Sequence, residues 1–247
     1  MFPLGSVLFP YMPLQLRVFE ERYLVMLSRI LTEEPAEFGV VLIERGQEVG
    51  GGEQRFTYGT IAQITELEGA DGFVGVAAQG DRRIEIREWL DEDPHPAAEV
   101  RYLPELEWDD ALLPLRVQAE QSVRRALALA SEFSDQQWSS TVELSDDPTA
   151  AAWQLAAIVP IGPLDQIELL RATTMGGLLR AVFDAAIAAE EALRTLWPDD
   201  DFADEVSGEA PDDLPDNGDG DGDGDGDGDS DGDRDGDGDV DPDDERR

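Results

Sequence analysis

The sequence predicts an α+β fold: a small, closed or half-closed β-barrel with one inserted helix, followed by a C-terminal helical bundle and a disordered acidic tail. Three observations support this prediction. Short branched runs separated by turn residues fill the first hundred positions. Good helix formers dominate from about residue 110, and Asp and Gly alternate near the C-terminus. We therefore expect a β-barrel subdomain at residues 1–105, a helical subdomain at 106–198 and a disordered Asp/Gly-rich tail at 199–247.

Strands are expected where branched and aromatic residues form short runs bounded by Pro, Gly or charge. These runs lie at residues 14–18, 38–43, 56–67, 73–78, 83–87 and 98–102, with loops at the glycine-rich segments 50–52 and 69–72. In the clearest run, Ile84 and Ile86 alternate with charged residues. That period of two is typical of a strand with one buried face and one wet face.

Helices are expected in one place within the strand region and in several places after it. Residues 19–31 place Tyr23, Met26, Leu27 and Ile30 at helical spacing, which favours one helix with an apolar stripe that packs into the core. In the second half, helical composition runs over about 110–130, and Asp147-Pro148 is typical of a helix start. Thr173 or Thr174 is a further cap candidate. The helix that follows it should end at Trp197-Pro198.

The tail lacks the apolar residues that a packed core requires. Between residues 216 and 241 Asp and Gly alternate almost strictly, so little burial can offset the conformational entropy lost on folding. Repulsion between like charges should keep the segment extended. We therefore expect a disordered, solubilising tail with weak association of cations.

The charge balance and the missing residue types exclude several functions. The formal net charge is −39, so a surface that neutralises nucleic-acid phosphates is not expected. The chain has no lysine, which excludes the P-loop and a serine–lysine dyad. It has no cysteine, which excludes thiol nucleophiles and cysteine-ligated zinc. The single histidine, His95, lies between two prolines and is expected in a loop; no cofactor or metal site is predicted.

The apolar opening FPLGSVLFPYMPLQLRVFEERY, residues 2–23, raises the question of a signal peptide or a membrane span. No basic residue precedes the apolar run, and Pro3, Pro10 and Pro13 interrupt it. The chain nowhere has the roughly 20 consecutive apolar residues of a spanning helix. We therefore expect a structural role for this segment, no membrane association and a cytoplasmic location.

Four segments together resemble the amino-terminal, substrate-binding domain of the Lon proteases. They are FPLGSVLFPYMPLQLRVFEERY at 2–23, FGVVLIERGQEVGGG at 38–52, GDRRIEIREWLDEDPHPAAEVRYLPE at 80–105 and, more loosely, LAAIVPIGPLDQIELLRATT at 155–174. Their order and spacing also fit, so the resemblance spans nearly all of residues 1–197. One departure is that only Met1 precedes the Phe-Pro-Leu, where the family usually has a few more residues.

The resemblance implies a PUA-like β-barrel followed by helices. It implies a stand-alone form without the ATPase and peptidase modules, because neither module can be present without lysine. The implied function is therefore a non-catalytic polypeptide-binding module or adaptor in bacterial-type protein quality control. Its partner would be unfolded or damaged polypeptide, or a protease or chaperone.

Candidate binding residues lie in the opening segment. Phe9, Tyr11 and Met12 sit among prolines, where their side chains could project outward. Exposed aromatic and methionine side chains suit promiscuous apolar binding. The alternative is that these three residues fill the barrel. The pair Arg82-Arg83 could hold an anionic group, or it could pair with Asp81 and Glu85 or stay solvated.

Two other function classes stay open at the level of sequence. The first is a small hydrolase or ligand-processing enzyme that uses paired carboxylates, although no pair stands out. The second is a calcium-responsive tail, because residues 233–244, DRDGDGDVDPDD, partly match a calcium loop of the EF-hand type. The polypeptide-binding hypothesis predicts binding to unfolded chains that survives deletion of the tail.

Overall fold

A computed structural model describes residues 1–43 and 55–196 of the chain. The predicted loop at 50–52, the predicted tail at 199–247 and the calcium-like loop at 233–244 lie outside the described residues. By internal contacts, residues 1–200 form one compact unit. The boundary at residues 105 and 106 between a β subdomain and a helical subdomain stays a prediction.

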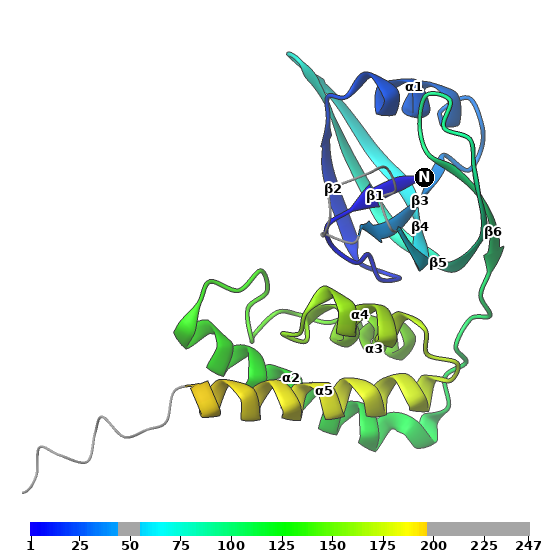
Figure 1. The fold of residues 1–247 in the computed structure, drawn as a ribbon. Helices are drawn as coiled ribbons and strands as arrows, with labels where there is room; N and C mark the ends of the chain where they lie inside the picture. The colour runs from blue at the N-terminus through cyan, green and yellow to red at the C-terminus, as the bar shows by residue number, and fades with distance from the viewer. Residues whose placement is uncertain (44–54, 197–247) are drawn as a thin grey trace, which may run out of the picture. The chain divides into compact units, whose positions relative to one another are not determined.

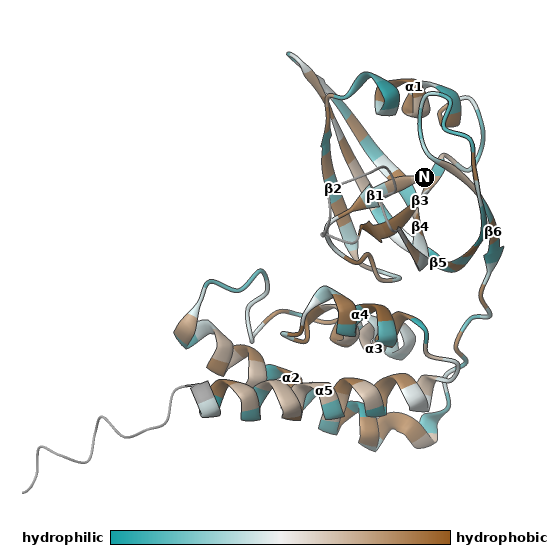
Figure 2. Ribbon diagram, in the orientation of Figure 1, coloured by the Kyte–Doolittle hydropathy of each residue, from teal (hydrophilic) through white to brown (hydrophobic). Residues whose placement is uncertain are grey.

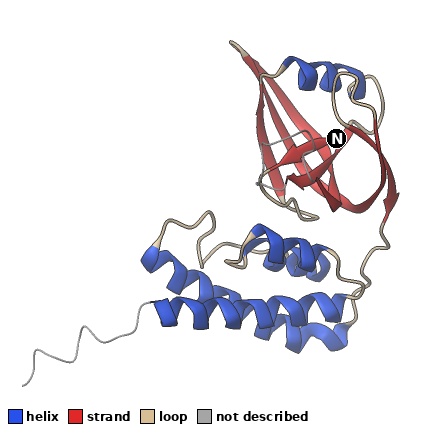
Figure 3. Cartoon of the chain, viewed as in Figure 1, coloured by secondary structure: helices blue, strands red, loops and turns tan. Residues whose placement is uncertain are grey.

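The described chain is a mixed α/β structure with a six-stranded sheet and five α-helices (Figure 1, Figure 3). The strands are β1 Phe2–Leu4, β2 Pro13–Val18, β3 Glu37–Ile43, β4 Arg55–Ala70, β5 Phe73–Leu90 and β6 Ala97–Tyr102. The helices are α1 Glu21–Ile30, α2 Leu113–Phe133, α3 Pro148–Ile158, α4 Pro163–Leu170 and α5 Met175–Leu196, with a short 3₁₀ turn at Asp110–Leu112. Of these helices, α4 has no counterpart among the predicted elements.

The sheet has the strand order β1-β3-β4-β5-β2, and β6 pairs with the second half of β5. β1 runs parallel to β3, and the other neighbours are antiparallel. β4 and β5 form a long hairpin closed by Asp71 and Gly72. Gly72 has a φ of 87°, which glycine adopts without steric cost. The predicted loop at 69–72 is therefore too long, because Gly69 and Ala70 still belong to β4.

β5 is one continuous strand where the sequence predicts two. The intervening residues 79–82 lack apolar alternation, yet Gln79 and Gly80 pair with Gln63 and Ala62 of β4, and Gly80 also bonds to the chain before β2. Gly80 is required there, because a Cβ atom at that position would lie 2.1 Å from the carbonyl oxygen of Phe9. A close backbone approach of this kind is not visible as a local pattern in the sequence.

The predicted helix caps are confirmed. Oδ1 of Asp147 accepts a hydrogen bond from the N–H of Ala150 at 2.7 Å and so caps α3, with Pro148 at the first helical position. Oγ1 of Thr174 accepts from the N–H of Gly177 at 3.1 Å at the start of α5. Both bonds satisfy N–H groups that a helix terminus leaves without an intrahelical partner.

A large hydrophobic core includes residues of both the sheet and the helices, among them Val40, Val76, Trp153 and Leu178. Figure 2 shows β3 as hydrophobic along its length, in agreement with its five consecutive buried residues. A second cluster, formed by Val41, Ile61, Ile84 and Ile86, lies apart from the first. No helix within residues 1–43 and 55–196 is long and apolar enough to cross a membrane.

Candidate functional site

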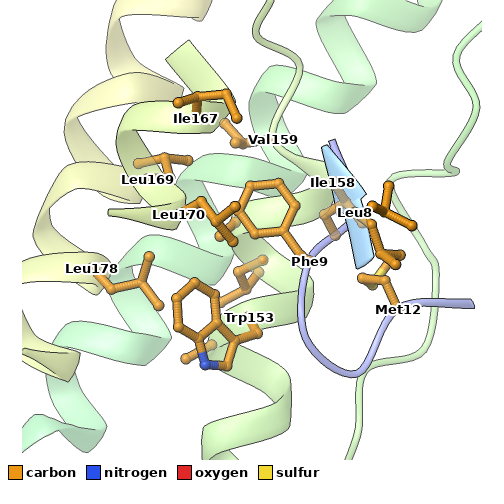
Figure 4. Packing of buried hydrophobic residues seen from close by; sticks show 14 of the residues in the cluster. Leu8, Phe9, Met12, Trp153, Ile158, Val159, Ile167, Leu169, Leu170 and Leu178 are labelled. Atoms are coloured by element: carbon orange, nitrogen blue, oxygen red, sulfur yellow. The ribbon is translucent and has the colours of Figure 1, made fainter. Parts of the chain in front are cut away.

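The segment between β1 and β2 contains the predicted binding residues, and it turns inward at Phe9. The Phe9 side chain is 1% exposed, and its ring lies 6.2 Å from the ring of Trp153 on α3. Figure 4 shows Phe9 surrounded by apolar side chains of α3 and α4, including Leu170. Phe9 therefore belongs to the core that connects the N-terminal segment to the helices.

The expectation that all three candidates project outward is wrong for Phe9 and Met12. Met12 is 7% exposed and belongs to the same core, whereas Tyr11 is 42% exposed. The reason is tertiary: the apolar surface of α3 and α4 covers the segment, and an apolar side chain gains about 1.5–3 kcal/mol from full burial. The alternative was that these residues fill the barrel; Phe9 and Met12 are indeed buried, but Phe9 packs against Trp153 of α3.

Hydrogen bonds hold this segment on the sheet. The buried Thr60 hydroxyl donates to the Leu8 carbonyl at 2.6 Å. The Tyr11 N–H donates to the Gly80 carbonyl at 2.7 Å, and the Gly80 N–H donates to the Met12 carbonyl at 2.9 Å. Tyr11 has a φ of 63°, the left-handed region that costs a non-glycine residue roughly 1–2 kcal/mol. These bonds keep Tyr11 in that conformation while its ring stays exposed.

Tyr11 should ionise at a higher pH than an ordinary tyrosine. Desolvation is the largest cause, and the negative charges of Asp147, Glu105 and Asp81 also raise the pKa of its hydroxyl above 10.0. Because the pKa is higher in the folded state, the stabilising effect is fully present below pH 10.0 and is lost as the pH rises through the folded pKa. Absorbance titration of tyrosinate, with Tyr11→Phe as the difference, should reveal this late ionisation.

The control for this prediction is Asp147→Asn, which keeps a side chain that can cap α3 but removes one negative charge. It should lower the Tyr11 midpoint. A Tyr11→Phe difference spectrum with its midpoint at or below pH 10.0 would contradict the assignment.

The adjacent arginines Arg82 and Arg83 have opposite environments. Arg82 is half-buried and pairs with Asp81 at 2.9 Å and with Glu37 at 3.0 Å, so pairing with Asp81 is confirmed. Arg83 is 5% exposed and donates to the carbonyls of Leu170, Ala172 and Pro104 at 2.6–2.8 Å. Burial lowers the pKa of its guanidinium.

The expectation that Arg83 pairs with acids, stays solvated or holds an anion is therefore wrong. Its hydrogen bonds go to backbone carbonyls, and its guanidinium lies 4.9 Å from the centre of the Trp153 ring. Glu85, the expected partner, pairs instead with Arg101 and Arg87. The predicted strand at residues 83–87 is part of β5. The side of this strand that was expected to face solvent is buried at Arg83, where Leu170 and Ala172 of the helical half contact it.

A groove of about 670 Å³ lies beside β2 and contacts two of the predicted residues, Phe9 and Met12. We call it the β2 groove. Among the described residues it is lined by residues 4–9 and 12–16, together with Gln137, Trp138, Ala157 and Gln166. Its walls therefore come from β1, the segment that follows it, β2, the chain after α2, and helices α3 and α4. The volume falls in the range of roughly 300–1,000 Å³ that is common for binding pockets.

None of the described residues that line the β2 groove is charged. Leu14, Leu16 and Trp138 are half-buried and contribute apolar surface, and Gln15 and Gln137 add exposed amides. In a chain with a net charge of −39, an uncharged hollow of this size is unexpected. The arrangement suits an apolar ligand that also needs hydrogen bonds. Tyr11 does not line the groove; it borders a separate hollow of about 60 Å³ with Arg82 and Trp153.

Sequence reasoning missed the β2 groove because its wall comes from distant parts of the chain. The segment 14–18 was predicted as a strand, and the apolar alternation of Leu14 and Leu16 was the available signal. The contributions of Gln137, Trp138 and Gln166 depend on how the helices pack on this segment.

Carboxylates line three other hollows, but all of them are exposed. One hollow contains Glu66 and Glu68, a second contains Asp81 and Glu105, and a third contains Asp165 and Glu168. Paired-acid chemistry typically places its two carboxylates in a cleft, whereas these side chains are exposed. Within residues 1–43 and 55–196, no group of three or more His, Cys, Asp or Glu side chains could hold a metal ion.

Comparison with known proteins gives one family match. A model of the ATP-dependent protease La (LON) substrate-binding domain matches residues 1–185. The Lon protease of Phenylobacterium zucineum (strain HLK1) is 31% identical over 114 residues. That alignment covers 45% of this chain and 14% of the longer protein, so the chain corresponds to a small part of that relative.

Two solved structures share the fold. A Lon N-terminal domain protein from Xanthomonas campestris has a TM-score of 0.52 and 24% identity, and covers 74% of this chain and 95% of its own. The N-terminal domain of a Mycobacterium avium complex Lon protease has a TM-score of 0.52 and 17% identity. The match covers 75% of this chain and 96% of that domain structure. At these identities the two structures support the fold alone.

Proposed function

Because the chain belongs to the Lon substrate-binding domain family, we propose that it is a non-catalytic polypeptide-binding module, with the β2 groove as its binding site. The observation that carries this proposal is the absence of charge from the described lining of a large groove in an acidic protein. Unfolded polypeptides expose apolar side chains and unpaired amides, and the groove presents both kinds of surface.

The proposal includes the finer features that the family suggests. We propose a PUA-like arrangement for the sheet, a bundle for the helices, a cytoplasmic location, and a role in protein quality control or as an adaptor for a protease. The roles proposed for the three candidate residues of the opening segment differ from those expected from the sequence. Phe9 and Met12 form part of the groove wall from the core side, and Tyr11 stays a candidate contact outside the groove.

The second function, hydrolysis by paired carboxylates, has no comparable support. The carboxylates in the described hollows are exposed, and the β2 groove has none in its described lining.

The test is binding of the full chain to a fluorescently labelled, permanently unfolded protein, measured by anisotropy with the folded form of the same protein as control. We expect selective binding of the unfolded form. The double variant Gln137→Glu/Gln166→Glu places two carboxylates in the groove with almost no change in side-chain shape. Because an apolar segment must desolvate these charges, it should weaken binding by about tenfold.

The matched control is Gln118→Glu, the same substitution at an exposed position of α2 that does not line the groove. It should bind as the wild type does. Equal binding by the wild type and the groove variant would exclude the β2 groove, and no binding of the unfolded protein by the wild type would overturn the proposed function.

A further inference from the structure

β2 lies at an edge of the sheet, next to the β2 groove. Among the described strands it pairs with β5 alone, through the register Leu14↔Ala78 and Leu16↔Val76. Figure 1 shows β2 as the outermost strand on its side of the sheet. An edge strand presents backbone N–H and C=O groups that can pair with an additional strand.

The hydrogen-bond pattern shows which groups point away from the sheet. Just before β2, the Gly80 N–H donates to the Met12 carbonyl and the Gly80 carbonyl accepts from the Tyr11 N–H, so the ladder is hydrogen-bonded at Gly80, one position before the pair Pro13↔Gln79. Antiparallel ladders alternate hydrogen-bonded pairs with pairs that share no hydrogen bonds. The backbone groups of Leu14 and Leu16 therefore point toward β5, and those of Gln15 and Arg17 point toward the outer edge.

The same strand also forms a wall of the groove. The side chains of Leu14 and Leu16 belong to the core side of the sheet and are half-buried. Leu4, Val7 and Trp138 line the groove with them. An added strand that uses the backbone groups of Gln15 and Arg17 would thus place every second side chain into an uncharged hollow that offers both apolar and amide surface.

We propose that an extended segment of an unfolded polypeptide binds by adding to β2 as a further strand, with alternate apolar side chains in the β2 groove. This inference rests on the proposed function and specifies how the client is recognised. Main-chain hydrogen bonds supply affinity that does not depend on sequence, and the groove selects uncharged apolar residues at alternate positions. Recognition of this kind fits a module that must bind many different unfolded chains.

The charge of the chain and the residues at the edge of β2 indicate which kind of polypeptide segment would bind there. The chain has a net charge of −39 while the described groove lining is uncharged, so the complementary segment is apolar at its centre and basic at its flanks. Pro13 lacks an N–H, and Arg17 places a charge on the edge. Both features disfavour permanent pairing between edges of two copies, and both leave the N–H and C=O of Gln15 available.

The decisive experiment uses N-methylated peptides. The probe is a labelled peptide of roughly nine residues with alternating Val or Leu and Thr, flanked by lysine, a length that matches an ordinary strand. One version carries N-methyl groups on the odd residues and the other on the even residues. Because only one set of N–H groups can face β2, one version should bind at least about tenfold more weakly, and the other should bind within about twofold of the unmethylated peptide.

The protein variant Gln15→Pro removes one of the two outward N–H groups of β2, at Gln15, and leaves that of Arg17; the β2–β5 ladder should be preserved because proline is tolerated at such edge positions. It should weaken binding at least about tenfold. Gln15→Ala removes the side chain but keeps the N–H, and it should weaken binding several-fold less than Gln15→Pro. Thermal unfolding of both variants reports whether the fold is kept, and the peptide comparison is independent of that result.

Equal effects of the two methylation patterns, with the unfolded protein still bound, would overturn strand addition and leave the proposed function standing. Failure of the wild type to bind the unfolded protein would overturn both. Sedimentation that shows a dimer which Gln15→Pro dissociates would assign the edge to a second copy of this chain and would also overturn the proposal.

Discussion

Phe9→Ala should lower the free energy of unfolding by about 3–5 kcal/mol, which is the range for removal of a buried phenylalanine side chain. Phe9 is 1% exposed, and its ring packs against Trp153 in the core between the N-terminal segment and the helices. The substitution removes the ring and leaves a cavity, because the segment is held on the sheet by the hydrogen bonds of Leu8 and Tyr11 and cannot collapse freely. Urea denaturation followed by circular dichroism measures the effect.

The control is Phe19→Ala, the same substitution at a residue that is 69% exposed. It should change the free energy of unfolding by no more than about 0.5 kcal/mol. A Phe9→Ala variant that unfolds at the wild-type midpoint but no longer binds unfolded protein would contradict the core assignment and return Phe9 to the binding residues.

Arg83→Met should lower the free energy of unfolding by about 3 kcal/mol, because the buried bond to the Leu170 carbonyl and the part-buried bonds to Ala172 and Pro104 lose their donor. The guanidinium donates to Leu170 and Ala172 in the helical half and to Pro104 in the segment after β6. Methionine fills part of the same volume but donates nothing. The predicted decrease in the free energy of unfolding therefore comes mainly from the lost hydrogen bonds and less from lost packing. Differential scanning calorimetry should show a lower unfolding midpoint for the variant than for the wild type.

The neighbouring Arg82→Met provides a matched control on the same strand. Arg82 pairs with Asp81 and Glu37 near the surface, and exposed ion pairs of this kind contribute about 0–1 kcal/mol. Equal effects of the two substitutions would show that the carbonyl contacts of Arg83 contribute little to stability.

Local patterns predicted most of the secondary structure. The alternation of Ile84 and Ile86 predicted a strand, the spacing of Tyr23, Met26 and Leu27 predicted α1, and Asp147 predicted the start of α3. These predictions succeeded because a strand or helix period and a cap depend on residues close in the chain. Residues 79–82 within β5 and helix α4 were missed, since their pairing and packing partners lie far away in sequence.

The candidate site was predicted less well than the fold. The sequence drew attention to the segment that contains Phe9, Tyr11 and Met12, and this segment does border the β2 groove. It did not show which side chains face inward, because that depends on the helices that cover the segment. Arg83 illustrates the same difficulty: a charged residue on a strand face expected to be wet became buried when the helical half supplied carbonyl acceptors.

The sequence by itself determined the family, through the segments at 2–23 and 80–105, and it excluded lysine- and cysteine-dependent chemistry because those residues are missing. It also determined the acidic charge of the molecule. Only the tertiary structure decided that Phe9 and Met12 are buried and that an uncharged groove lies beside the edge strand β2. The physical reason is that composition and periodicity are properties of the chain, whereas burial and grooves arise where surfaces from distant segments meet.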